Sequence, residues 1–149
     1  MTCDATELKR LGIDENNSPT INAYEKYLGE ILPPSETIRD MFIDVNMQLP
    51  LSDLYCFTGG LMIEIPDFMT FYDGKPHTKK MTFTAHPIRN SIVYVTLKKS
   101  EAKGSEPRSV QVDFMLKTGA TFSFFETNEN AARLEYITKT YLLPNIGNG

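Results

Sequence analysis

The sequence predicts a mainly β fold, a barrel or sandwich of seven short antiparallel strands, with a helix after the last strand and an extra helix before the first. Three observations lead to this prediction. Apolar residues recur at every second position in short stretches, and turn residues separate these stretches. No helix-length segment joins them, so the crossovers that parallel strands require are absent. Residues 127–143 carry apolar side chains at helical spacing, so a helix can close the open end of a barrel.

The N-terminal part of the chain predicts a tail followed by a helix. Residues 1–17 are polar and are expected to form a flexible tail, and residues 18–145 are expected to form a single domain. Ser18 is a suitable helix cap and Pro19 a suitable first helical residue. The helix is expected over residues 19–31, because the two prolines that follow at 33 and 34 disfavour its continuation.

The strands and the second helix follow in order. Strands are expected over residues 41–49, 53–58, 61–66, 79–85, 91–99, 109–117 and 121–126. Short turns at Gly59-Gly60, Asp73-Gly74 and Gly119 separate three pairs of them. In the C-terminal helix, Leu134, Ile137 and Tyr141 form an apolar stripe that is expected to face the barrel, with Glu135 on the opposite, exposed face.

Composition restricts the possible functions. The chain has 149 residues, of which 41% are hydrophobic and 23% charged, as in an ordinary soluble domain. A net charge of −4 argues against a nucleic-acid-binding surface. The chain has no apolar run long enough to cross a bilayer and no signal-peptide pattern at residues 1–10. We therefore expect a cytoplasmic protein.

The residue types that carry catalysis or bind metals show no typical spacing. Cys3 and Cys56 lie far apart, and with His77 and His86 they do not form a metal-ligand pattern. No nucleophile motif surrounds a serine, and no phosphate-binding GK[ST] sequence follows the glycines of the first turn. The sequence therefore predicts a protein without catalytic residues, metal or cofactor.

Three short segments carry a resemblance to a known family. They are ILPPSE at 31–36, CFTGGLMIEI at 56–65, and MTFTAHPIRNSIVYVTL at 81–97 with Ile88 at a bend. In order and spacing, residues 21–143 resemble the bacterial pleckstrin-homology-like domains, a branch of the pleckstrin-homology superfold. The resemblance implies a seven-stranded barrel with a C-terminal capping helix. It also implies homo-oligomer formation through barrel edges or through the added helix.

One position departs from the family pattern. The family usually has polar or basic residues in the turn after Thr58, including an arginine before the leucine, whereas this chain has Gly59, Gly60 and Leu61. Because Gly59, Gly60 and Leu61 have no basic side chain, they cannot perform the function of the family's arginine. We therefore interpret the hairpin as part of the barrel wall.

The basic residues favour an alternative function. Residues 75–108 carry eight Lys or Arg and only two Asp or Glu. Pleckstrin-like barrels that bind phosphoinositides use basic side chains from inter-strand loops, and such side chains neutralise phosphates. An anionic lipid or another phosphate-bearing ligand could therefore bind the loops at 75–80 and 98–108. The candidate ligand-binding residues are Lys75, Lys79, Lys80, Lys98, Lys99, Lys103 and Arg108.

A dense apolar run favours an interaction function. Residues 65–72, IPDFMTFY, hold too many large apolar side chains for a strand with one wet face. The candidate oligomer-interface residues are Ile65, Phe68, Met69, Phe71 and Tyr72. The favoured hypothesis is a non-enzymatic, self-associating interaction module. A small-ligand carrier or enzyme with an open barrel cavity is a further alternative, which bulky Phe114, Phe122, Phe124 and Phe125 oppose by filling the interior.

Overall fold

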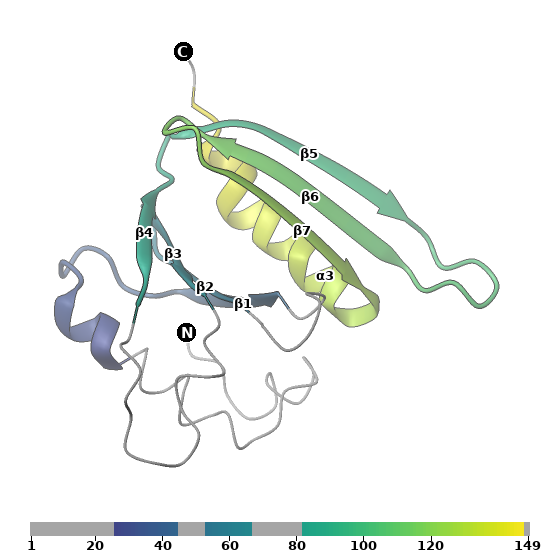
Figure 1. Cartoon of the computed structure of the whole chain (residues 1–149), viewed down its shortest axis with the longest axis horizontal. Coiled ribbons are helices and arrows are strands. Elements are labelled where there is room, and N and C mark those ends of the chain that lie inside the picture. The colour runs from purple at the N-terminus through teal and green to yellow at the C-terminus, as the bar shows by residue number, and fades with distance from the viewer. Residues whose placement is uncertain (1–25, 45–52, 67–81, 148–149) are drawn as a thin grey trace. The chain divides into compact units, whose positions relative to one another are not determined.

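The computed structural model describes residues 26–44, 53–66 and 82–147. The chain forms two compact units, Met1–His86 and Pro87–Gly149, and each is described here by itself. The first unit is built around a four-stranded antiparallel sheet. The second is built around a three-stranded antiparallel sheet and the C-terminal helix (Figure 1).

The sheet of the first unit has the strand order β1-β2-β3-β4. Its strands are β1 (Asp40–Asp44), β2 (Asp53–Phe57), β3 (Leu61–Ile65) and β4 (Thr84–Pro87). One face is apolar, because Met41, Ile43, Leu54, Cys56, Ile63 and Ile65 share it through the cross-strand register. Leu28, from the helical residues 26–31, has no exposed surface and belongs to the same core cluster. The extra N-terminal helix is therefore present over its described part and contributes to this core.

The sheet of the second unit has the order β5-β6-β7. Its strands are β5 (Ile92–Ser100), β6 (Ser109–Leu116) and β7 (Thr121–Thr127), and they run side by side in Figure 1. The inner face is a buried core because alternate residues of β6, Val110, Val112, Phe114 and Leu116, all have no exposed surface. The ring of Phe114 stacks on Phe122 at 5.1 Å and meets Phe124 edge-on at 5.7 Å.

The C-terminal helix covers this inner face. Helix α3 (Asn128–Ile137) contacts β6 and β7, and Leu134, Ile137 and Tyr141 are all buried, as the apolar stripe predicts. After α3 the backbone continues as a π-helical segment (Thr138–Leu142) and a 3-10 turn (Leu143–Asn145). Pro144 was expected to end the helix, but the α-helix ends earlier, at Ile137, and Pro144 lies within the 3-10 turn, where a missing amide hydrogen is tolerated.

The fold prediction is confirmed at the level of a mainly β protein. Seven antiparallel strands occur in the expected order and a helix follows them. In the described ranges the pairing produces two separate sheets, which are not closed into one barrel. The strand expected over 79–85 is observed from Thr84 to Pro87, so its pairing extends to the proline where a bend was expected. The second half of the strand expected over 41–49 lies outside the described residues.

Candidate functional site

The Thr58–Leu61 turn, which belongs to the CFTGGLMIEI motif, is hydrogen-bonded to the ILPPSE segment. The Thr58 amide donates to the Leu61 carbonyl at 3.0 Å, which closes the turn. The Glu36 carboxylate accepts hydrogen bonds from the Thr58 hydroxyl at 2.5 Å and from the Gly60 amide at 3.1 Å. The Thr58 hydroxyl oxygen in turn accepts from the Gly60 and Leu61 amides. These contacts assign the hairpin a structural role, because its polar groups are used within the turn.

The second face of the first sheet combines the buried apolar residues Phe42, Phe57 and Met62 with several acidic residues. Tyr55 lies opposite Phe42 and Glu64 in the register, with Asp53 two residues before it in the same strand. Burial raises the pKa of Tyr55 well above its usual value, and the negative charges of Asp53, Glu64 and Asp44 raise it further. The phenol therefore stays protonated over the whole physiological range and acts as a hydrogen-bond donor.

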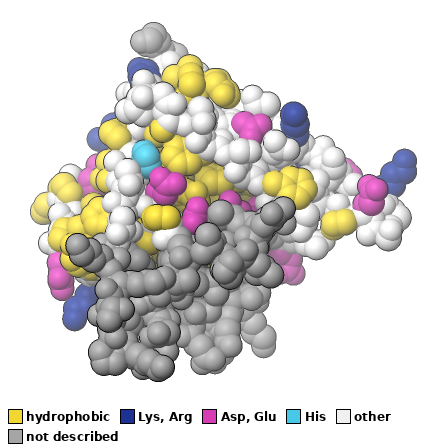
Figure 2. Space-filling view, in the orientation of Figure 1, with side chains coloured by type: hydrophobic (Ala, Val, Ile, Leu, Met, Phe, Trp, Pro, Cys, Tyr) yellow, Lys and Arg dark blue, Asp and Glu magenta, His cyan; other side chains and the backbone are white. Residues whose placement is uncertain are grey.

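His86 lies on the neighbouring strand β4. Its Nε2 atom is 3.0 Å from Glu64 Oε1, and Figure 2 shows the histidine beside an acidic side chain. His86 therefore contacts a carboxylate, rather than only the local backbone that a residue at a bend would reach. His77 lies outside the described residues. In the described part of the chain, no group of three or more His, Cys, Asp or Glu is arranged to hold a metal ion.

The four described basic candidates lie on the β5–β6 hairpin, and only Lys99 and Arg108 approach the same group, the carboxylate of Glu135. Lys98 and Lys99 are consecutive strand residues, so their side chains leave opposite faces of the sheet. Lys103 lies near the tip, where basic and acidic side chains adjoin in Figure 2. Arg108 directly precedes β6. The other three candidates, Lys75, Lys79 and Lys80, lie outside the described residues.

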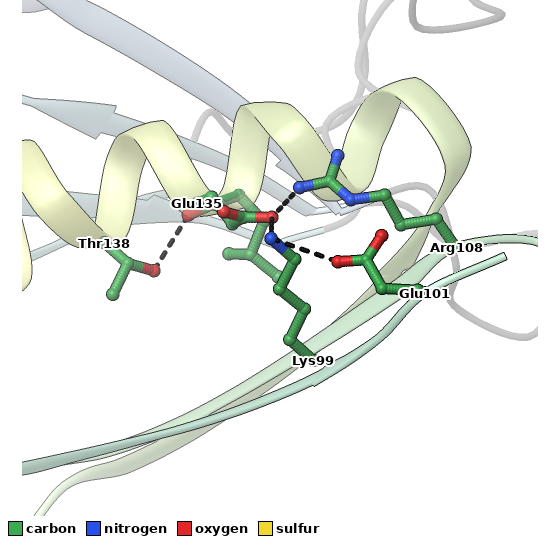
Figure 3. Close-up of polar contacts among 6 residues, drawn as sticks. Lys99, Glu101, Arg108, Glu135 and Thr138 are labelled. Atoms are coloured by element: carbon green, nitrogen blue, oxygen red, sulfur yellow. Dashed lines mark hydrogen bonds and ion pairs between the residues drawn. The ribbon is translucent and has the colours of Figure 1, made fainter.

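Glu135 binds two of these basic side chains (Figure 3). Its Oε1 atom pairs with Arg108 Nη2 and lies 3.8 Å from Lys99 Nζ. Lys99 also lies 3.3 Å from Glu101. The expectation that Glu135 lies on the exposed face of the helix is wrong, because its side chain is only 30% exposed and faces the hairpin. The network ties α3 to β5 and β6 and places acidic groups beside the basic ones.

The network predicts weak binding to anionic membranes. We expect little binding of the protein to phosphatidylserine-containing vesicles at physiological salt, measured by co-sedimentation. Glu135→Gln removes the charged partner of Arg108 and one of the two charged partners of Lys99, and at about 1 kcal/mol per basic residue near the surface it can strengthen binding by at most about 2 kcal/mol. Tight, salt-sensitive binding of the unaltered protein that is lost on Lys98→Ala with Lys103→Ala would contradict this expectation.

Of the five proposed interface residues, only Ile65 lies in the part of the chain that the structure describes. Ile65 lies in β3, opposite Leu54, and has no exposed surface. Phe68, Met69, Phe71 and Tyr72 lie outside the described residues. The proposed contact of this run with a partner therefore stays a prediction.

Two surfaces of the second unit were not identified from the sequence. The first is the outer edge of β5, where Val93, Tyr94 and Leu97 are each exposed by more than 40%. The second is the outer face of the β5-β6-β7 sheet, where Tyr94 and Phe125 flank a central Asp113. Phe125 was expected in the interior, but it is 42% exposed on this face. The signal available in the sequence was the run of consecutive apolar residues in β5. A strand with only one face in solvent alternates apolar and polar residues, so such a run indicates exposed apolar side chains.

The comparisons with known proteins give no family assignment. No protein-family model, no curated protein and no solved structure matches the chain. Among the helices that the structure describes, none is long and apolar enough to span a membrane.

Proposed function

We propose that the chain is a non-enzymatic assembly module with a pleckstrin-homology-like fold, and that it associates with further copies of itself. The order of seven antiparallel strands and a closing helix supports the fold. The hydrogen bonds from Thr58 and Gly60 to Glu36 add to this support, because they join two of the motifs on which the resemblance rests. No side-chain arrangement described above supplies a nucleophile with a base.

The exposed edge of β5 is the observation that carries the proposal. The strand is nine residues long and pairs through one edge with β6. Its other edge borders no further strand of the described sheet, and there Ile92 forms a bridge with Ile146 and accepts a hydrogen bond from the Gly147 amide. A long edge with exposed apolar side chains is a template for pairing with another strand, and proteins usually protect such edges.

The sequence of β5 suits pairing with a second β5. In an antiparallel pair with its two-fold axis at Thr96, Leu97 lies opposite Val95, Lys98 opposite Tyr94, and Lys99 opposite Val93. Like charges then never lie directly opposite each other, and each lysine stem packs on an apolar neighbour. An axis at Lys98 would instead place two lysines together. Assembly through this edge agrees with the implication of the family resemblance.

Leu97→Glu is expected to weaken self-association by more than tenfold, equivalent to about 1.4 kcal/mol or more. The substitution places a carboxylate where the edge of a second copy would bury an apolar side chain. Molar mass measured by light scattering across a dilution series tests this, and the unaltered protein should be dimeric or larger at micromolar concentration.

Tyr136→Glu is the matched control. Tyr136 is exposed to the same extent as Leu97, 44% against 43%, but it belongs to α3 and not to the strand whose edge is tested. The control should associate like the unaltered protein. A monomeric unaltered protein at all concentrations, or equal loss of association in both variants, would refute the β5 interface.

The carrier or enzyme alternative finds no support in the core of the second unit. The stacked rings of Phe114, Phe122 and Phe124 occupy the space between the sheet and α3. An enclosed ligand cavity would need this space to be empty.

A further inference from the structure

The outer face of the β5-β6-β7 sheet presents a regular grid of side chains. The register places Thr96, Asp113 and Ser123 in one row across the three strands. The adjacent rows are Tyr94, Met115 and Thr121 on one side, and Lys98, Gln111 and Phe125 on the other. The face is therefore a polar centre between two exposed aromatic side chains.

The Asp113 row and the Tyr94 row border an open depression of about 510 Å³. Its lining includes Tyr94, Thr96, Asp113, Thr121, Phe122 and Ser123. This volume falls within the range of small-molecule sites. On the outer face this lining offers hydroxyl groups, one carboxylate and the ring of Tyr94, and no basic side chain contributes to it.

The carboxylate at the centre is held in a fixed orientation. Asp113 Oδ1 accepts a hydrogen bond from the Ser123 hydroxyl at 2.5 Å. The Gln111 amide lies 3.3 Å from Oδ2 and 3.5 Å from Oδ1. A polar group that its neighbours already position loses less freedom when a ligand binds.

The balance of charge selects the class of ligand. The absence of basic groups from the lining disfavours an anion. Lys98 lies on the same face, one row from Asp113, so the nine residues of the grid carry no net charge and a cation gains little. The hydroxyls of Thr96 and Thr121 can each donate and accept, and the Ser123 hydroxyl, whose hydrogen is donated to Asp113, can still accept, which matches the hydroxyls of a sugar. The exposed ring of Tyr94 offers an apolar surface for the C–H face of a sugar ring.

We propose that this face binds a neutral oligosaccharide, with Asp113 as the central acceptor and Tyr94 and Phe125 as the two stacking platforms. Strand spacing and rise place these two aromatic residues about 16 Å apart across the grid. A ligand that reaches both must therefore be longer than one sugar ring. The grid shares Tyr94, Thr96 and Lys98 with the strand β5 that we assign to self-association, whereas Asp113, Ser123 and Phe125 lie on β6 and β7.

Titration calorimetry of the full chain with cellotetraose, maltotetraose, xylotetraose and chitotetraose tests the proposal. At least one of the four should bind, and Asp113→Asn and Ser123→Ala should each weaken that binding by tenfold or more. Glu106→Gln and Ser105→Ala are the matched controls, because both residues are exposed at the hairpin tip and should leave binding unchanged. Molar mass, measured in parallel, should be the same for all four variants.

Three results would overturn the proposal. One is the absence of binding by all four oligosaccharides at millimolar concentration. Another is binding of spermidine, but of no oligosaccharide, that disappears in Asp113→Asn, which would identify a cation site. Loss of oligosaccharide binding in the controls as well would place the ligand elsewhere and would equally contradict it.

Discussion

Leu134→Ala combined with Ile137→Ala is expected to unfold the protein, or nearly so. Both side chains have no exposed surface and lie on the face of α3 that contacts β6 and β7. Truncating a buried Leu or Ile to Ala typically costs about 2–5 kcal/mol, through lost transfer energy and the cavity that remains. The two changes together approach the whole stability of a domain of this size, which is about 5–15 kcal/mol.

Urea unfolding followed by circular dichroism measures the effect. Thr140→Ala is the control, because Thr140 is exposed on the same C-terminal segment and should change the free energy of unfolding by less than about 0.5 kcal/mol. A double variant with the midpoint of the unaltered protein would show that α3 does not support the sheet. The fold proposal would then lose its main energetic basis.

Glu36→Ala is expected to lower the free energy of unfolding by about 2–3 kcal/mol. The carboxylate accepts from the Thr58 hydroxyl and the Gly60 amide, and a hydrogen bond to a charged group contributes about 1.5–3 kcal/mol. Thr58 is fully buried, so its hydroxyl loses its acceptor without gaining water. The two bonds share one carboxylate, so their contributions do not simply add.

The same urea measurement tests this prediction in the first unit. Glu30→Ala is the matched control, since Glu30 is an exposed carboxylate on the helical residues 26–31. It should leave stability within about 0.5 kcal/mol of the unaltered protein. Equal midpoints for Glu36→Ala and Glu30→Ala would mean that the hairpin is not held by Glu36.

The parts of the fold that follow from local pattern could be predicted from the sequence. Alternation at Val110, Val112, Phe114 and Leu116 specified β6 and its buried face, because side chains of a strand alternate between faces. The helical spacing of Leu134, Ile137 and Tyr141 similarly specified which side of the C-terminal helix is buried. These patterns depend only on residues close together in the chain.

Features that depend on distant residues could not be predicted. Glu135 was expected on the exposed face because the helix pattern alone does not reveal Arg108, which lies 27 residues earlier and approaches it through the fold. The grid around Asp113 likewise requires the exact register of three strands, and a shift of one residue would exchange the two faces. The bulge between Ile92 and Tyr94 adds such a shift inside β5, so counting along that strand alone assigns its faces incorrectly.

Amide hydrogen exchange along β5, compared at low and high protein concentration, tests the central proposal most directly. If a second copy pairs with the outer edge of β5, amides between Val93 and Lys99 that point away from β6 become protected as concentration rises. Amides of β6, which already pair on both sides, should exchange equally at both concentrations. Identical exchange of the β5 amides across the range, in a protein whose molar mass does increase, would show that it assembles through another surface.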